Sequence, residues 1–147
     1  MSDSIAASSS PAPVAPARGH LIAAVFVGGA FGTLLRAALL TWVPHDAGGW
    51  PVATLVVNLV GAFAIGVISV WLPRAPDLDP RLQPFLATGF CGGLTTFATL
   101  QVELVLLVDH GAWGVAAGYL AVTLVGGIVA VLAGRAVAAG EEGARRS

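Results

Sequence analysis

The sequence predicts an all-α integral membrane protein with four transmembrane helices. Of its 147 residues, 56% are hydrophobic and only 10% are charged, whereas a soluble domain carries about a quarter charged residues. Four apolar stretches each have roughly the 20 residues needed to cross a hydrocarbon core. The third stretch contains paired glycines and paired threonines, which predict a helix broken in the middle of the membrane.

The four predicted spans form one membrane domain, residues 20–138, between two tails. They cover residues 21–43, 52–72, 85–108 and 113–137. Residues 1–19 are rich in Ala, Ser and Pro and have no helical or strand period, so we expect a disordered tail that is not cleaved as a signal peptide. Residues 139–147 form a short, charged and loose carboxyl-terminal tail.

The first span carries one charge, Arg36, near its far end. An arginine is costly in hydrocarbon, so it either extends to the interface or faces a wet cavity. Gly28 and Gly32 are four residues apart and give this helix a smooth face for close packing. Trp42 and Trp50 flank the first loop, where an amphipathic ring serves as an interfacial anchor.

The second and fourth spans each present two polar side chains on one face. Thr54 and Asn58 are one helical turn apart, and so are Tyr119 and Thr123. A buried Asn has two donors and two acceptor lone pairs that must find partners in lipid. Ordinary hydrogen bonds between helices explain both faces, and a polar pathway explains them too, so the pattern leaves both interpretations open.

The third span holds Gly-Phe-Cys-Gly-Gly-Leu-Thr-Thr-Phe at residues 89–97. Irregular backbone at membrane depth is tolerated only inside protein or beside a polar cavity, so this stretch is either a kink between packed helices or an ion or substrate site. Glu103 follows it, and we favour a structural role as a partner for backbone donors over a proton or ion role. Cys91 has no possible intramolecular disulfide partner and is interpreted as a small packing residue.

Composition and motifs restrict the function. The chain has no nucleotide-binding glycine loop, metal-ligand spacing or nucleophile beside a base, so we do not expect an enzyme. A formal charge of -1 without a basic run gives no reason to expect nucleic acid. Four spans cannot easily enclose a path alone, so we expect an oligomer. Uncharged donors without a ring of positive charge suit a small anion that must bind and still leave. These donors are the Asn58 amide and the hydroxyls of Thr54, Thr95, Thr96, Thr99, Tyr119 and Thr123.

The motif at residues 89–97 resembles the signature of the Fluc/CrcB fluoride channels, and the similarity extends over all four spans. The resemblance implies passive fluoride export across the cell inner (plasma) membrane, which lowers cytoplasmic fluoride toxicity. It implies an antiparallel, dual-topology-type dimer with a structural sodium ion (Na+) at its centre. Backbone carbonyls of Gly92 and Thr95 from both subunits would hold this ion, because hard oxygen ligands suit a hard cation.

The same resemblance assigns residues to the fluoride pathway. The ring edge of Phe97 is weakly positive and would face the anion. The pathway would use Asn58, Phe97, Tyr119 and Thr123 beside the donors Thr96 and Thr99, with Arg36 and Glu103 as further site residues. The chain departs from the family pattern at Ala98, Leu100 and Gly127, which removes hydroxyls and one phenyl ring from the pathway. The sodium site is not affected by these departures.

Charge asymmetry predicts the orientation. One side of the membrane holds the two tails and the middle connector, with five arginines, Arg18, Arg74, Arg81, Arg145 and Arg146, and the opposite loops hold no Lys or Arg. The positive-inside rule therefore places both termini in the cytoplasm. Such a bias opposes insertion in both directions, so our hypothesis is that this chain pairs with a related chain of opposite orientation.

Two other functions are compatible with the composition. A small proton-coupled multidrug exporter also has four short spans in an antiparallel dimer, but it depends on a carboxylate in the first span, where this chain has only Arg36. A non-transporting membrane scaffold subunit would explain the small-residue stripes and would leave the aligned donors without a purpose. A fluoride electrode assay on liposomes separates these functions.

Overall fold

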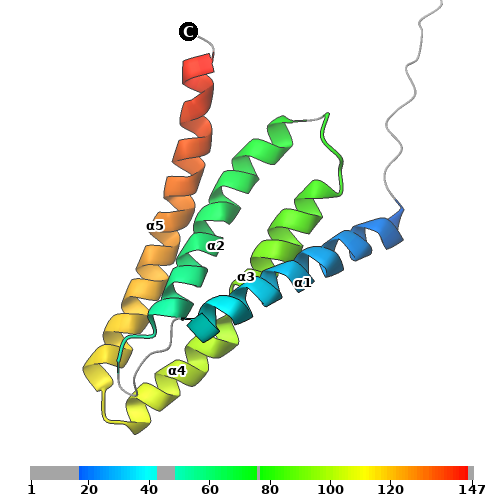
Figure 1. The fold of residues 1–147 in the computed structure, drawn as a ribbon. Helices are drawn as coiled ribbons and strands as arrows, with labels where there is room; N and C mark the ends of the chain where they lie inside the picture. The colour runs from blue at the N-terminus through cyan, green and yellow to red at the C-terminus, as the bar shows by residue number, and fades with distance from the viewer. Residues whose placement is uncertain (1–16, 43–48, 76, 146–147) are drawn as a thin grey trace, which may run out of the picture.

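The computed structural model describes residues 17–42, 49–75 and 77–145 (Figure 1). Within these residues all regular structure is helical, and four segments are long and apolar enough to cross a membrane. They are Arg18–Trp42, Val52–Arg74, Pro84–Asp109 and Trp113–Gly140. The four predicted spans are confirmed, and the chain is a multi-pass membrane protein. Residues 1–16 of the expected amino-terminal tail lie outside the described residues.

The spans are built from seven helical elements. In chain order these are α1 (Arg18–Trp42), α2 (Val52–Trp71), the 3-10 turn η1 (Leu72–Arg74), the π-helical η2 (Pro84–Cys91), α3 (Gly92–Leu94), α4 (Phe97–Asp109) and α5 (Trp113–Arg145). Thus η2, α3 and α4 together make the third span. The connector between η1 and η2 and the turn at Gly111, with φ of 74°, join consecutive spans.

Helix α5 is longer than the fourth predicted span, which ends at residue 137. It continues to Arg145 through a stretch rich in Ala and Glu. These residues favour a helix by their intrinsic propensity, even where the apolar pattern of a membrane span has ended. Its 33 residues make a helix of about 50 Å at 1.5 Å per residue. That length exceeds a hydrocarbon core of about 30 Å. The predicted loose tail from residue 139 is therefore helical as far as Arg145.

Helices α2 and α5 lie side by side and run in the same direction (Figure 1). Glycines bring their backbones into direct contact. A Cβ on Gly66 would collide with the Val131 carbonyl, and one on Gly134 would collide with the Phe63 carbonyl. Each helix thus uses one glycine to admit the backbone of the other, which is a common device between membrane helices.

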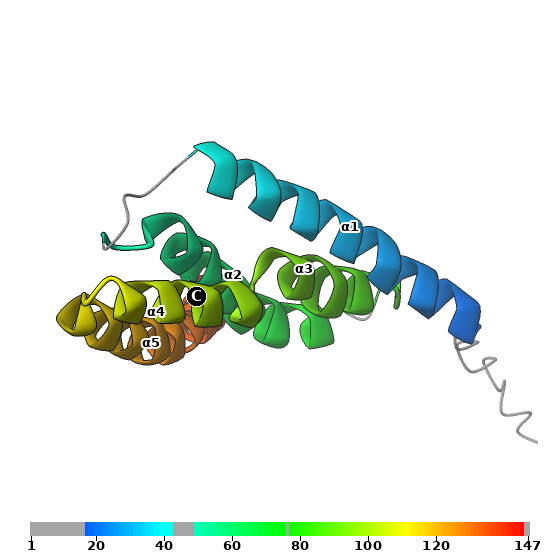
Figure 2. The same cartoon turned by 90° about the horizontal axis from the view of Figure 1, so that it is seen from below.

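Helix α1 lies to one side of the other helices and packs mainly on η2 and α3 (Figure 2). Gly28 and Gly32 are the buried residues of α1, and a Cβ on either would meet backbone atoms of the third span. Gly89 and Gly93 receive α1 in the same way from the other side. The predicted smooth face of the first span is confirmed. Cys91 is fully buried and free in this region, as a packing residue should be.

Candidate functional site

The third span changes conformation at two consecutive threonines. Thr95 has φ/ψ of −75°/154° and Thr96 has −148°/118°, so both are extended between α3 and α4. Two extended residues prevent the regular i to i+4 bonding pattern of a helix across this point. The backbone groups at the junction therefore need other partners.

Asn58 on α2 supplies two of these partners. The Thr96 backbone N–H donates to Asn58 Oδ1 at 2.8 Å, and Asn58 Nδ2 donates to the Thr96 carbonyl oxygen at 3.2 Å. The side-chain amide thus pairs with both backbone groups of one extended residue. Gly61 lies near the same place, where a Cβ would collide with the Thr95 side-chain methyl group. Helix α2 is therefore fitted closely against the junction.

The Thr96 side chain begins helix α4. Its Oγ1 accepts a hydrogen bond from the Thr99 backbone N–H at 3.1 Å, which is the standard N-cap arrangement for a threonine. The same oxygen donates to Thr99 Oγ1 at 2.9 Å. Thr95 Oγ1 instead donates back to the Cys91 carbonyl at 2.9 Å. The two threonines therefore stabilise opposite sides of the junction.

A buried carboxylate lies further along α4. Glu103 is 6% exposed, and its two oxygens accept hydrogen bonds from Thr54 Oγ1 at 2.6 Å and from the Tyr119 hydroxyl at 2.7 Å. Bonds this short to a carboxylate are charge-assisted. Because Thr54 is on α2 and Tyr119 is on α5, Glu103 links three helices. Its partners are hydroxyls, not the backbone donors that we expected.

Trp50 packs on the same tyrosine, a contact that the sequence does not predict. Its ring lies edge-on to the Tyr119 ring, with centroids 6.4 Å apart and an interplanar angle of 83°. A tryptophan beside a loop is typical of an interfacial anchor, and no spacing in the sequence relates it to Tyr119. Thr54, which donates to Glu103, is likewise not among the predicted pathway residues. Its position one turn from Asn58 nevertheless placed it on the correct face of the second span.

These side chains form one polar cluster between α2, α4 and α5. We define the polar cluster as Thr54, Asn58, Thr96, Thr99, Glu103 and Tyr119. The Tyr119 and Thr54 hydroxyl protons are committed to Glu103. The second N–H of Asn58 and the proton of the Thr99 hydroxyl have no acceptor in the described part of the chain. The cluster therefore contains hydrogen bonds that hold the helices together and, on Asn58 and Thr99, neutral donors that have no acceptor among the described residues.

Thr123 lies one turn beyond Tyr119 on α5. Its Oγ1 is buried and has no hydrogen-bond partner among the described residues. Thr54 on α2 and Tyr119 on α5 both donate to Glu103, and α2 runs parallel to α5 (Figure 1). Asn58 and Thr123 each follow one turn later on their own helix, so both lie on the same side of Glu103. A buried hydroxyl without a partner costs about 1–3 kcal/mol, so this position is suited to a ligand that can accept a hydrogen bond.

Three other predicted residues lie outside the polar cluster. The Phe97 side chain is 69% exposed on the outer surface of α4. Gly92 is also exposed, and a Cβ there would meet nothing within 4 Å. Arg36 is half-buried on α1, without a hydrogen bond or ion pair to the described residues. A single chain therefore does not bring these three residues to the polar cluster.

The fold and the polar cluster define a small four-span membrane protein with uncharged donors between its helices. The chain matches the family described as "CrcB-like protein, Camphor Resistance (CrcB)" over residues 23–135. It belongs to this CrcB family, and the resemblance predicted from the third-span motif is confirmed. The match includes all of the polar cluster and the junction at Thr95 and Thr96.

Similar proteins carry the name of a channel. The "Fluoride-specific ion channel FluC 1" of Mycolicibacterium paratuberculosis is 49% identical over 111 residues, 75% of this chain and 83% of that protein. The "Fluoride-specific ion channel FluC 2" of Nocardia farcinica is 41% identical over 138 residues, 94% of this chain and 99% of that protein. A FluC protein of Proteus mirabilis is 43% identical over 111 residues. These names describe ion channels.

Proposed function

We propose that this protein is a fluoride-specific ion channel that lets fluoride leave the cell passively. The observation that carries the proposal is the set of neutral donors without an acceptor among the described residues, on Asn58, Thr99 and Thr123, in a chain whose relatives are named fluoride channels. Neutral donors replace part of the hydration shell of a small anion without the tight binding that a fixed positive charge would cause. An anion can therefore both enter and leave.

The Glu103 carboxylate has a structural role in this proposal. A negative charge repels an anion, but here both carboxylate oxygens already accept short hydrogen bonds from Thr54 and Tyr119. These bonds orient the Tyr119 ring and hold α4 against α2 and α5. Its lack of a free oxygen also makes Glu103 a poor exchange site for a proton-coupled drug exporter, and the first span carries no acid.

A structural sodium ion at the junction belongs to the same proposal. In an uninterrupted helix the Gly92 carbonyl would accept from Thr96 N, and the Thr95 carbonyl would accept from Thr99 N. Thr96 N is bonded to Asn58 and Thr99 N is bonded to Thr96 Oγ1 instead. The regular donors of both carbonyls are thus bonded elsewhere. Two such oxygens from each of two subunits suit a hard monovalent cation, which would stabilise the junction.

A dimer is required for this arrangement, and exposed apolar surface supports one. On α4 the side chains of Phe97, Val102 and Val105 are 58–69% exposed, and Gly92, five residues before Phe97, is exposed as well. A second subunit that covers this surface would bring Phe97 beside a pathway and would complete the sodium ligands. We propose that the partner is antiparallel and that the junction of each third span lies at mid-membrane depth.

The identity of the partner follows from the charge asymmetry. Arg18, Arg74 and Arg81 lie on the side of the membrane where α1 begins and α2 ends, which we place in the cytoplasm with both termini. A chain that inserts in only one direction needs a related chain of opposite orientation as its antiparallel partner. Several relatives have names numbered 1 or 2, a numbering that is used where one organism has two related chains.

A flux assay on liposomes tests the proposed function. The purified protein is reconstituted, alone or together with a related chain from the same genome, into vesicles loaded with potassium fluoride. Fluoride efflux is followed with a fluoride electrode after valinomycin is added. We expect rapid fluoride efflux and no efflux from matched potassium chloride vesicles. Efflux of both anions, or drug-driven proton flux without fluoride efflux, would contradict the proposal. Labelling of the termini from both membrane faces in equal amounts would contradict the paired-chain arrangement.

A further inference from the structure

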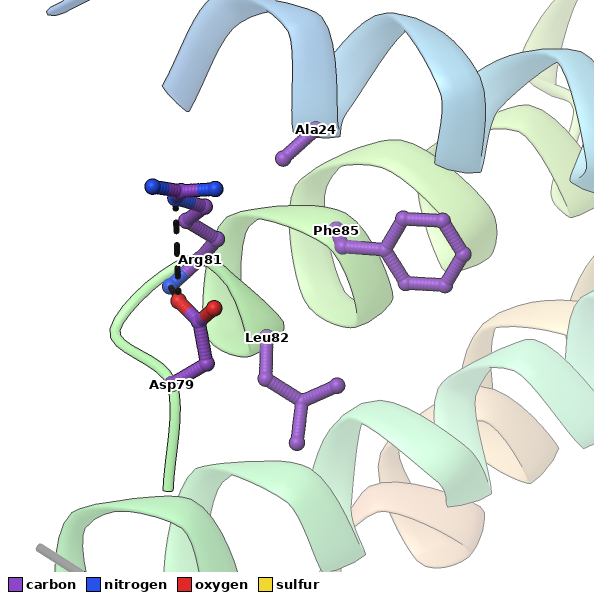
Figure 3. Close-up of a pocket in the computed structure, with 5 residues that line it drawn as sticks. All are labelled: Ala24, Asp79, Arg81, Leu82 and Phe85. Atoms are coloured by element: carbon purple, nitrogen blue, oxygen red, sulfur yellow. Dashed lines mark hydrogen bonds and ion pairs between the residues drawn. The ribbon is translucent and has the colours of Figure 1, made fainter. Parts of the chain in front are cut away.

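A cavity of about 310 Å³ lies where the connector meets α1 and η2 (Figure 3). It is separate from the polar cluster, which lies deeper in the protein between α2, α4 and α5. Its walls come from three parts of the chain, with an apolar portion and a charged portion. The residues that line it are Ala24, Asp79, Arg81, Leu82 and Phe85.

The position of this cavity corresponds to the edge of the membrane. Ala24 is in the second turn of α1, and Phe85 is the second residue of the third span. Arg81 and Asp79 precede that span in the connector. Figure 3 shows the charged pair at one end of the cavity and the Phe85 ring at the other. The cavity thus crosses from the level of lipid headgroups to the level of acyl chains.

Asp79 orients Arg81 but contacts only one nitrogen of its guanidinium group, Nε. Asp79 Oδ1 accepts from the Arg81 backbone N–H at 2.8 Å and lies 3.8 Å from Arg81 Nε. The terminal nitrogens of Arg81 have no partner within the described ranges. A guanidinium group presents its donors in a planar fork that matches two phosphate oxygens. The Asp79 carboxylate opposes an anion, but the oxygen nearer to Arg81 is already bonded to Arg81.

We propose that this cavity binds one anionic phospholipid, with the headgroup phosphate on Arg81 and an acyl chain against Ala24, Leu82 and Phe85. The juxtaposition of a half-exposed arginine and an apolar wall at the ends of two spans matches the two-part chemistry of such a lipid. The proposal is independent of fluoride conduction. It gives the contact between α1 and η2 a lipid ligand at its cytoplasmic end.

A second hollow on the same end of α1 provides a comparison. Its volume is about 390 Å³ and its lining is wholly apolar, formed by Leu21, Ile22, Val25 and Phe26. Without a charged side chain, this hollow accepts acyl chains and does not discriminate between headgroups. Headgroup preference is therefore the property that distinguishes the cavity at Arg81 from ordinary contact with the bilayer.

Native mass spectrometry of the full chain in detergent tests the proposal. Phosphatidylglycerol and phosphatidylcholine with identical acyl chains are titrated separately, and inorganic phosphate is titrated in a third series. We expect phosphatidylglycerol to bind more tightly than phosphatidylcholine by about fivefold, the factor of one basic residue beside an anionic lipid. Inorganic phosphate at the same concentration should not bind. Equal binding of the two lipids, or phosphate binding as tight as that of the lipid, would overturn the proposal.

Three variants locate the preference. Arg81→Gln removes the positive charge that favours the net-anionic phosphatidylglycerol over the zwitterionic phosphatidylcholine. Ala24→Leu fills the apolar portion while keeping that charge, so each substitution should abolish the preference for phosphatidylglycerol. Arg135→Gln removes an exposed arginine of α5, outside the cavity, and should retain the preference. Each variant is first shown to keep the circular dichroism and melting temperature of the parent. A preference that survives Arg81→Gln or Ala24→Leu would refute the site, as would its loss in Arg135→Gln.

Discussion

The side-chain amide of Asn58 pairs with both backbone groups of Thr96, through hydrogen bonds of 2.8 Å and 3.2 Å. One residue of α2 thereby replaces the helical bonds that an extended residue cannot make. The interruption in the third span is thus specified by another helix as well as by its own glycines and threonines. This pairing directs Thr96 N away from the Gly92 carbonyl, and the Thr96 side chain in turn holds Thr99 N away from the Thr95 carbonyl.

Asn58→Asp should abolish fluoride efflux while the protein stays folded. Aspartate keeps an acceptor for Thr96 N, but it loses the NH2 donor and places a negative charge beside the Thr96 carbonyl and the proposed anion route. We expect efflux in the liposome assay to fall by at least tenfold, about 1.4 kcal/mol in barrier height, with an unchanged elution volume.

Asn58→Ala is the matched variant for that experiment. It removes both hydrogen bonds to Thr96 without adding a charge, and it leaves the Thr96 backbone groups unsatisfied, at a cost of about 1–3 kcal/mol in stability. A lower stability with measurable efflux in Asn58→Ala, and no efflux in Asn58→Asp, would assign the effect to charge. Unchanged efflux in Asn58→Asp would remove Asn58 from the pathway.

Glu103 and Tyr119 should be energetically coupled. Tyr119→Phe removes the donor of the 2.7 Å bond, and Glu103→Gln removes the charge of the acceptor. A hydrogen bond to a charged group contributes about 1.5–3 kcal/mol, so a double-mutant cycle of unfolding in mixed micelles should give a coupling of about 1 kcal/mol or more. Strictly additive effects would show that this bond does not stabilise the fold. Thr41→Val, which removes an exposed hydrogen bond on α1, is the control and should change stability little.

Gly32 and Gly29 should respond in opposite ways to the same substitution. A Cβ on Gly32 would collide with the Phe90 carbonyl and lie 2.8 Å from Leu94 N, and backbone atoms cannot move aside cheaply. Overpacking of this kind costs about 1–3 kcal/mol. On Gly29 the nearest atom, the Gly89 carbonyl oxygen, is 3.8 Å from the Cβ position.

Melting temperatures in detergent measure both effects. Gly32→Ala should melt at a lower temperature than the parent, because α1 is forced away from η2 and α3. Gly29→Ala should melt at the same or a higher temperature, since alanine favours a helix over glycine by about 1 kcal/mol. Equal destabilisation by both substitutions would show that packing between α1 and the third span does not depend on these particular glycines.

Local sequence features predicted the spans and much of their packing. Length and apolar composition define the four spans, and four-residue spacing placed Gly28 with Gly32 and Thr54 with Asn58 on single faces. These properties depend only on helical geometry within one segment. The expected structural role of Glu103 came instead from the cost of a carboxylate in the membrane, and it named backbone donors, whereas the structure gives two hydroxyl partners.

Pairing between distant segments could not be derived in this way. The hydroxyls that bond Glu103 are 49 and 16 residues away, so their identity depends on how α2, α4 and α5 cross. The edge contact of Trp50 with Tyr119 has the same origin. The extension of α5 to Arg145 was missed for another reason, because helix propensity continues after the apolar pattern of the membrane span ends.

Two threonine variants separate the ways in which the junction could hold sodium. Thr95→Ala keeps the backbone carbonyl and removes only a hydroxyl that bonds Cys91, so sodium binding should survive. Thr96→Val removes the oxygen that accepts from Thr99 N, which leaves that N–H free to bond the Thr95 carbonyl and compete with the ion. The shift in melting temperature when sodium replaces N-methyl-D-glucamine measures binding without any flux. We expect the shift to persist in Thr95→Ala and to shrink in Thr96→Val. Loss of the shift in Thr95→Ala alone would assign the ion to the hydroxyl, and no shift in the parent would remove sodium from the junction.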